Sequence, residues 1–283
     1  MLDSQLSATF EISNEVSAEI KTVPHFRDSH YRNWNLSNLL RSYSYGYVKP
    51  LVKRRPFNRT TLISDVGTGY GWLAFALALE TPATIIAVDF DEKRVDAAKA
   101  IGTILGLNDR IDWRVGSLGR LPLGNAETAM ACCLEVIEHV DTKPATVHDL
   151  SRTTSDILLI STPNGALPVV FHDTSLPGCH FLSPRMRDFY AKALGRIHLQ
   201  DNNQFWRPRQ LAQALPDFNR VSKFLQFSDF AEWHELHTQM LQNPIGHYER
   251  PYQLQSSYYR SVAKLSSWSY YCLPNLASIW RRR

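Results

Sequence analysis

The clearest chemical signal in the chain is a glycine-rich stretch with an acid in front of it. Residues 65–71 read DVGTGYG, an apolar segment ending at Ile63 precedes them, and a helix-like apolar run over 73–79 follows. This order predicts a strand, a glycine turn and a helix. Glycines allow positive φ and close approach of a ligand, and the first amides of a helix favour a carboxylate or a phosphate. The stretch therefore predicts a ligand site.

A second acid ends the next apolar segment. Residues 85–88 read IIAV, and Asp89 follows them about 20 residues beyond the glycines. An acid at this distance from a glycine turn is where the two ribose hydroxyls of a nucleotide cofactor are held. The two features together indicate a cofactor that carries a nucleoside.

The spacing of the glycines distinguishes between cofactors. A dinucleotide fingerprint reads GxGxxG, whereas this chain has Gly67, Gly69 and Gly71 after Asp65. A carboxylate at Asp65 would repel a pyrophosphate but would suit a zwitterionic methionine. The pattern resembles motif I of the class I S-adenosylmethionine-dependent methyltransferases. The resemblance implies that Asp65 orients the loop or meets the ammonium group of that cofactor.

Two further stretches extend this resemblance. Residues 133–140 read CLEVIEHV and residues 160–164 read ISTPN, which is similar to the ubiquinone-biosynthesis O-methyltransferases and related small-molecule enzymes. The resemblance covers roughly residues 61–164, a little over a third of the chain. It is specific for the cofactor domain and says much less about the methyl acceptor.

The resemblance and the alternation of strand-like and helix-like segments imply an α/β fold. We expect a Rossmann-like, doubly wound, mostly parallel seven-stranded sheet, with ligands at the carboxyl ends of its strands. The expected strands lie near 62–66, 84–89, 111–115, 128–133, 156–161 and 219–227, and the expected helices near 71–80, 92–105 and 143–154.

Three parts of the chain are expected. The resemblance implies that residues 1–58 form a helical N-terminal lid, the alternative being an extra helix at the edge of the sheet, and that residues 59–228 form the cofactor-binding domain, with a cover insertion at about 165–210. Residues 229–283, which are rich in aromatic side chains, would form a helical C-terminal extension.

The resemblance assigns cofactor contacts to particular positions. Gly67 and Gly69 would bring backbone amides to the methionine part, Asp89 would hold the ribose, and Phe90 would stack on the adenine. Ser117 stands where the family usually has an acid for the adenine amino group, which weakens the expected contact. The remaining candidates are Thr68, Tyr70, Leu118, Leu134, Glu135 and, from the N-terminal segment, Arg41.

Histidines are the candidates for work at the acceptor. His139 follows the fourth expected strand and is the candidate general base, since imidazole has a suitable pKa. The alternative is a histidine at a helix entry that bonds to backbone. His172 and His180, in the expected cover, are candidates for acceptor contact. Together with Asp173 and Cys179 they form no recognised ligand pattern, so we predict no metal site.

Composition narrows the class of protein. The chain has 283 residues, 44% of them hydrophobic, as globular proteins do. Its net charge of +4 does not favour nucleic acid as a partner. Four cysteines lack metal-ligand spacing and indicate free thiols in a reducing compartment. The start lacks the pattern of a signal peptide and no apolar run could span a bilayer, so we expect a cytoplasmic protein.

The sequence thus predicts transfer of a methyl group from S-adenosylmethionine to a small-molecule or lipid-like acceptor, with oxygen favoured as the methylated atom and nitrogen and carbon left open. An NAD(P)-dependent oxidoreductase, a non-catalytic scaffold of the same fold and a nucleic-acid methyltransferase are the alternatives. The oligomeric state is open. Peripheral membrane contact is a further hypothesis, because Trp268, Tyr270, Tyr271 and the segment 280–283 combine aromatic and basic side chains. Ordinary packing of these aromatic residues is the competing interpretation.

Overall fold

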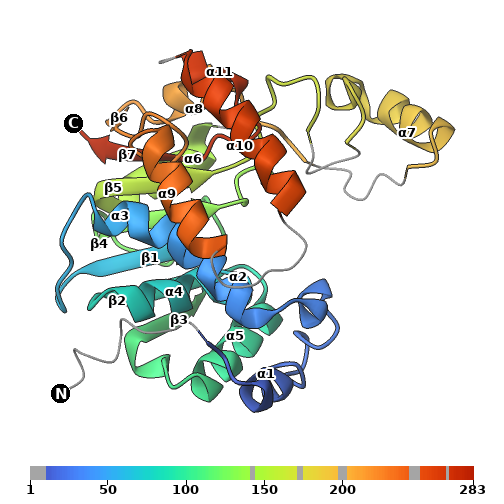
Figure 1. The fold of residues 1–283 in the computed structure, drawn as a ribbon. Helices are drawn as coiled ribbons and strands as arrows, with labels where there is room; N and C mark the ends of the chain where they lie inside the picture. The colour runs from blue at the N-terminus through green and yellow to red at the C-terminus, as the bar shows by residue number, and fades with distance from the viewer. Residues whose placement is uncertain (1–10, 141–143, 171–174, 197–202, 242–248, 266–267) are drawn as a thin grey trace.

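The computed structural model describes residues 11–140, 144–170, 175–196, 203–241, 249–265 and 268–283. A seven-stranded sheet with the order β3-β2-β1-β4-β5-β7-β6 forms its centre (Figure 1). The strands are β1 (Leu62–Val66), β2 (Thr84–Asp89), β3 (Ile111–Val115), β4 (Thr128–Leu134), β5 (Thr154–Ser161), β6 (Phe218–Arg220) and β7 (Ser278–Arg282). Strands β1 to β5 are parallel, and β7 pairs antiparallel with both β5 and β6. The expected doubly wound, mostly parallel sheet is therefore confirmed.

The order of the strands reverses between β1 and β4. The chain runs outward from β1 to β2 and β3, then returns to place β4 on the other side of β1. Ligands of open α/β sheets bind at such a switch point, outside the carboxyl ends of the strands. The glycine turn follows β1 at this point, and the segment CLEVIEHV continues from β4 beside it.

Helices cover both faces of the sheet. The helical elements are α1 (Asn14–Ile20), α2 (Leu36–Tyr43), η2 (Ser44–Val48), α3 (Lys49–Val52), α4 (Trp72–Glu80), α5 (Glu92–Ile104), α6 (Pro144–Thr153), α7 (Pro184–Ala193), α8 (Pro208–Ala214), α9 (Phe230–Leu241), α10 (Glu249–Ala263) and α11 (Ser269–Cys272), with short 3₁₀ turns η1 (His30–Asn33), η3 (Asn108–Arg110) and η4 (Cys179–Phe181). Asp91 caps α5 as expected, and its side chain accepts a hydrogen bond from the Lys93 amide at 3.0 Å.

Two hydrophobic cores lie on opposite faces of the sheet because successive side chains of a strand point to opposite sides. Ile63, Ile85 and Met130 pack with α1, α2, α4 and α5 on one face. Ile86 and Leu158 pack with α6 and α8 on the other. Helix α4 is buried on all sides, since α2 covers the surface that the sheet leaves free. The N-terminal segment is thereby part of the main core.

The last two strands differ from expectation. A strand over 219–227 was expected, but β6 ends at Arg220, because Leu225 has a φ of 51° and Phe224 and Phe227 pair across a tight turn. The seventh strand is β7, within the segment interpreted as a C-terminal extension. Trp280 is buried in β7 and Tyr270 is buried beneath it. The hypothesis that Trp280 and Tyr270 touch a membrane was wrong, because both rings pack in the core.

The segment after β5 contains a separate small arm. Helix α7 lies well apart from the sheet in Figure 1. Ser183 and Pro184 begin α7 as expected, although the Ser183 side chain makes no capping hydrogen bond. Leu176, Cys179 and Ala191 form a small core of their own. No helix in the described ranges is both long enough and apolar enough to cross a bilayer.

Candidate active site

The glycine turn after β1 adopts left-handed backbone at each glycine. The φ angles of Gly67, Gly69 and Gly71 are 76°, 56° and 86°. A Cβ on Gly67 would lie 2.2 Å from Cγ2 of Val136, so the loop after β4 packs directly against the turn. A Cβ on Gly69 would meet nothing within 4 Å. The turn therefore offers open space for a ligand at Gly69 and close packing at Gly67.

The amides expected to meet the ligand are already used within the protein. The amides of Gly67 and Thr68 both donate to the Val88 carbonyl, at 2.7 and 3.0 Å. The Gly69 amide donates to Oδ2 of Asp89 at 2.8 Å. These three amides are therefore not free to donate to a ligand, and the turn contributes close approach of a ligand to the backbone instead.

Asp89 ties the turn to the end of β2. Its other oxygen, Oδ1, accepts a hydrogen bond from the Asp91 amide at 3.0 Å, and the residue is 3% exposed. A carboxylate oxygen has two lone pairs, so both oxygens can still accept from a pair of ribose hydroxyls. The neighbouring Phe90 is 67% exposed, which leaves its ring available to stack on a planar group. The assignment of Asp89 to the ribose and of Phe90 to the adenine stays a prediction.

Asp65 is a second buried carboxylate under the same turn. Its Oδ2 accepts a hydrogen bond from Thr68 Oγ1 at 2.6 Å, and the residue is 2% exposed. The pKa of Asp65 is raised to about 7, chiefly by burial; the Thr68 hydroxyl opposes the shift and the charge of Asp89 adds to it. Two buried acids side by side produce a negative potential that favours a cationic ligand group.

Tyr70 connects the turn to the N-terminal segment. Its ring packs edge-on against Phe26 and Tyr31, with centroids 5.0 and 5.8 Å apart. Its hydroxyl lies 3.2 Å from Nδ1 of His25. Residues 25–31 thus lie over the start of α4. These contacts occupy both the ring and the hydroxyl of Tyr70, and the role of the segment as a lid stays a prediction.

Two tyrosines that sequence reasoning did not assign to the site point toward it. Tyr43 ends α2 and Tyr47 lies in η2, which is a π-helical turn, an element often found at functional sites. Burial raises the pKa of both hydroxyls, and the charge of Glu135 acts on both; Asp65 also acts on Tyr43. The aromatic density of residues 43–47 was the available signal.

A polar cluster lies just past β4. Oε1 of Glu135 accepts hydrogen bonds from Ser161 Oγ and from Asn275 Nδ2, the latter at 2.7 Å. Tyr47 is hydrogen-bonded to Ser161 as well. The φ of Glu135 is 54°, an uncommon conformation for a residue with a Cβ. We call Glu135, Ser161, Asn275 and Tyr47, together with Glu138, the β4 polar cluster.

Glu138 belongs to this cluster as a buried acid. Its pKa is raised to about 9, chiefly by burial and next by the charge of Glu135, while hydrogen bonds from the backbone and from Thr162 oppose the shift. Thr162 Oγ1 donates to its Oε2 at 3.0 Å. Glu138 is therefore a neutral acid at pH 7, next to the Glu135 carboxylate.

The other predicted residues are distributed around this edge. His139 is exposed, and its Nδ1 lies 2.8 Å from Oδ1 of Asn203. Leu134 ends β4, and Ser117 and Leu118 follow β3, with Ser117 exposed. Arg41 is buried in α2.

Of the two histidines in the expected cover, the structure describes only one. His180 stacks on Phe181 with ring centroids 3.9 Å apart, and His172 lies outside the described residues. Within the described part of the chain, no three His, Cys, Asp or Glu side chains are grouped to hold a metal ion. Cys132 and Cys133 are buried free thiols, as expected.

Comparison with known families decides the class. Residues 63–156, from β1 into β5, match the family model described as a methyltransferase domain. The chain carries a methyltransferase domain, and the protein is an S-adenosylmethionine-dependent methyltransferase. The match favours this class over the oxidoreductase alternative. No curated protein sequence matches the chain significantly.

Solved structures agree with the fold across most of this methyltransferase. A candidate sarcosine dimethylglycine methyltransferase from Galdieria sulphuraria aligns over 95% of this chain and 98% of its own, with 10% identity and a TM-score of 0.52. The MccD protein aligns over 85% and 96%, with 14% identity and a TM-score of 0.51. The geranyl diphosphate C-methyltransferase from Streptomyces coelicolor aligns over 96% and 92%, with 10% identity and a TM-score of 0.50. At these identities the similarity concerns the fold alone.

S-adenosylmethionine is the cofactor of the class, and the residues of this methyltransferase fit it. The open space at Gly69 admits a ligand against the backbone. Asp65 suits the cationic groups of the methionine part, Asp89 suits the ribose, and the exposed Phe90 suits the adenine. These are the residues that would hold the cofactor in this chain.

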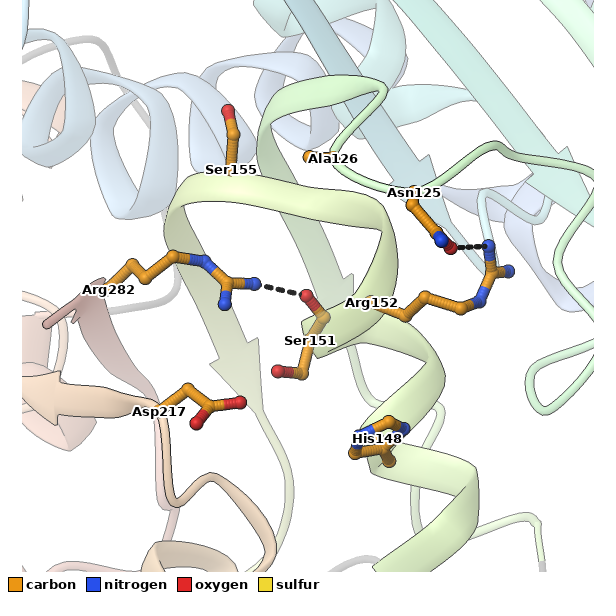
Figure 2. Close-up of a pocket in the computed structure, with 8 residues that line it drawn as sticks. All are labelled: Asn125, Ala126, His148, Ser151, Arg152, Ser155, Asp217 and Arg282. Carbon is orange, nitrogen blue, oxygen red and sulfur yellow. Dashed lines mark hydrogen bonds between the residues drawn. The ribbon is translucent and has the colours of Figure 1, made fainter.

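A pocket of about 420 Å³ lies at the opposite edge of the sheet (Figure 2). Its arginines serve the fold: Arg152 bonds to Asn125, Asp149 and the Leu123 carbonyl, and Arg282 bonds to the carbonyls of Ser151 and Thr154. The glycine turn lies at the carboxyl edge of the sheet, so this pocket is separate from the candidate cofactor site.

Proposed function

We propose that this methyltransferase transfers a methyl group to the hydroxyl oxygen of a small-molecule or lipid-like acceptor. The observation that carries the proposal is the β4 polar cluster, which adjoins the cofactor turn through the contact of Val136 with Gly67. Tyrosine, serine and amide groups around a carboxylate suit an acceptor that both donates and accepts hydrogen bonds. A hydroxyl group does both.

The chemistry at the acceptor requires proton transfer. S-adenosylmethionine supplies an activated methyl group, and an alcohol or phenol must lose its proton as the oxygen–carbon bond forms. His139 is our candidate base. Asn203 Oδ1 accepts from its Nδ1, which makes Nε2 the nitrogen that can take a proton. Glu135 would orient the acceptor oxygen through the cluster. Tyr43 and Tyr47 would line the acceptor side of the site.

The N-terminal segment would act as a lid in this proposal. Phe26 and Tyr31 pack on Tyr70 at the cofactor turn, and α2 carries Tyr43 toward Asp65. A segment that contacts both ends of the site can exclude water from the reacting groups. We also propose that His172 and His180, from the cover, contact the acceptor.

The first experiment is calorimetric titration with S-adenosylmethionine, S-adenosylhomocysteine and NADH. We expect the first two to bind and NADH not to bind. The purified protein is then incubated with S-adenosylmethionine and a panel of phenols, catechols, alcohols and amines, and S-adenosylhomocysteine is measured by mass spectrometry. Turnover of hydroxyl compounds supports the proposal. Turnover of amines alone contradicts methylation at oxygen, and cofactor binding without turnover of any class favours the scaffold alternative.

With an active hydroxyl acceptor, His139→Gln should lower kcat by about 100-fold or more, the range for loss of a general base. Raising the pH should restore part of the loss, because a more acidic solution keeps the acceptor protonated. The matched control is His148→Gln, an exposed histidine at the opposite edge of the sheet, which should retain full activity (Figure 2). Equal activity of the two variants would remove His139 from the mechanism.

A further inference from the structure

We propose that the outer face of α7 docks on an anionic lipid surface. We define this α7 face by four exposed residues, Arg185, Met186, Phe189 and Lys192. The inference does not depend on the identity of the methyl acceptor. It concerns where the enzyme sits when it works, not which atom it methylates.

The α7 face combines large apolar side chains with cations on one side of the helix. Phe189 is 76% exposed and Met186 is 57% exposed. Positions 185, 189 and 192 lie on one face at helical spacing, and Met186 flanks them. Arg187 and Ala191, on the opposite side, are buried. An apolar face flanked by Arg and Lys is the pattern of a helix that lies in a membrane interface.

The arm uses its inner side, not the α7 face, for its own folding. Ala191 packs with Leu176 and Cys179 in the small core of the arm. An Arg187 nitrogen donates to the His180 carbonyl at 3.3 Å and joins α7 to η4. The outer apolar residues are therefore not needed to hold the arm together. Their exposure has no explanation within the fold of the described residues.

Charge identifies the partner. Arg185, Lys192 and Arg196 are exposed around the face. The nearby acid, Asp188, lies 3.8 Å from Lys192, and this exposed ion pair contributes little. A second copy docking through the same face would bring cations against cations. An anionic lipid surface complements both the cations and the apolar residues.

The position of the arm suits an enzyme that faces a membrane. Helix α7 follows the carboxyl end of β5, the edge that carries the glycine turn, and it lies away from the rest of the molecule (Figure 1). Two more exposed apolar residues, Phe181 and Leu194, lie just before and just after the helix in the chain. Docking through α7 would bring this edge of the sheet near the membrane.

The test is sedimentation of the full-length protein with vesicles of phosphatidylcholine alone and of phosphatidylcholine mixed with phosphatidylglycerol. We expect binding to the mixed vesicles, weakened by high salt, and little binding to the neutral ones. The variant Met186→Ser/Phe189→Ser should lose about tenfold or more in vesicle affinity. The variant Arg185→Gln/Lys192→Gln should lose about fivefold for each charge.

Matched controls remove the same chemistry elsewhere. Val221→Ser replaces an exposed apolar residue after β6, and Lys99→Gln replaces an exposed cation on α5. Both should bind vesicles as the unchanged protein does. Every variant should fold, because the altered side chains are exposed. Circular dichroism and S-adenosylmethionine titration verify this.

Several outcomes would overturn the proposal. These are no binding to anionic vesicles, equal binding to neutral vesicles, or unchanged binding of both α7 variants. A dimer in size-exclusion chromatography that dissociates in Met186→Ser/Phe189→Ser would instead assign the face to contact between copies. Absence of methyl transfer in a protein that still binds anionic vesicles would contradict the proposed function and leave the docking proposal supported.

Discussion

Asp65 and Asp89 place two carboxylates under one glycine turn, and each is almost completely buried. Buried charges are costly unless they are paired or hydrogen-bonded. Asp89 receives two backbone hydrogen bonds, whereas the acid at Asp65 is left with a pKa of about 7. Such an arrangement favours a bound cation, and S-adenosylmethionine carries a sulfonium and an ammonium group. The site is therefore electrostatically matched to its cofactor before binding.

This match predicts a pH dependence of cofactor affinity. Below pH 7 Asp65 is mostly protonated and attracts a cation less, so S-adenosylmethionine should bind about tenfold more weakly at pH 6 than at pH 8. Asp65→Asn should bind weakly at both pH values and lose most of this dependence. Calorimetric titration at the two pH values measures both effects. An equally steep dependence in the Asn variant would assign the titrating group elsewhere.

Glu138 predicts a pH dependence of stability. Its pKa is about 9 in the folded protein against 4.5 for the free side chain, so the folded state holds more protons between these values. Stability should therefore fall as pH rises through this window, by at most about 1.4 kcal/mol per pH unit for this group. Glu138→Gln keeps an oxygen for Thr162 and cannot ionise, so its stability should depend less on pH. Urea denaturation at pH 6 and pH 8.5 tests this, and equal slopes for the two proteins would contradict it.

At the scale of elements, the glycine turn and the loop after β4 form one unit. A Cβ on Gly67 would clash with the side chain of Val136, the residue after Glu135, so the turn cannot hold a Cβ unless Val136 moves. The π-helical turn η2 adds Tyr47 to this cluster from the N-terminal segment. Three separate segments thus determine the position of Glu135. Val136 thus connects the glycine turn, on the cofactor side, with the loop after β4, on the proposed acceptor side.

The variant Gly67→Ala tests the contact between Gly67 and Val136. Alanine at a φ of 76° is strained by about 1–2 kcal/mol, and the clash with Val136 should add about 1–3 kcal/mol. Gly106→Ala is the matched control, because its φ is 69° and a Cβ there would meet nothing within 4 Å. Thermal unfolding should rank Gly67→Ala as clearly less stable than Gly106→Ala. Adding Val136→Ala to Gly67→Ala should recover part of the difference, and equal losses at the two glycines would contradict the contact.

At the scale of the whole molecule, the C-terminus completes the central sheet. Strand β7 lies between β5 and β6, although it follows β5 by more than a hundred residues. Arg282 donates to the Ser151 carbonyl in α6 (Figure 2) and to the Thr154 carbonyl at the start of β5. Arg281 and Arg55 both pair with Asp156. The N-terminal segment, the sheet and the last strand are thereby connected at one edge. The protein should fold as a unit.

Two tryptophans measure the contribution of β7. Trp280→Ala removes a buried ring and should lower the free energy of unfolding by about 3–5 kcal/mol. Trp268→Ala is the control, since this ring is 65% exposed, and it should change stability by no more than about 0.5 kcal/mol. Urea denaturation of both variants gives the comparison. Similar small effects would mean that the last strand is not part of the cooperative unit.

The sequence by itself determined the cofactor half of this protein. A strand, a glycine turn and a helix are local features of the chain. The spacing from Gly67 to Asp89 is set by one β-α-β unit, so this motif can be recognised from the sequence alone. The strands β1 to β5 were located from apolar runs because parallel strands are buried on both faces. Asp65 and Asp89 accordingly lie near the carboxyl ends of β1 and β2, with Phe90 directly after β2, and their contacts with the cofactor stay a prediction.

The tertiary structure alone decided which distant segments meet. Nothing in residues 278–282 distinguishes a sheet strand from a terminal extension, because β7 is defined by pairing with β5 and not by local pattern. Tyr47, Ser161 and Asn275 reach Glu135 from three separate parts of the chain, and no local spacing encodes such a meeting. The exposure of Phe189 and the burial of Trp280 likewise follow from packing. Both are aromatic residues near basic ones in the sequence, and only the fold places one in the core and the other on the surface.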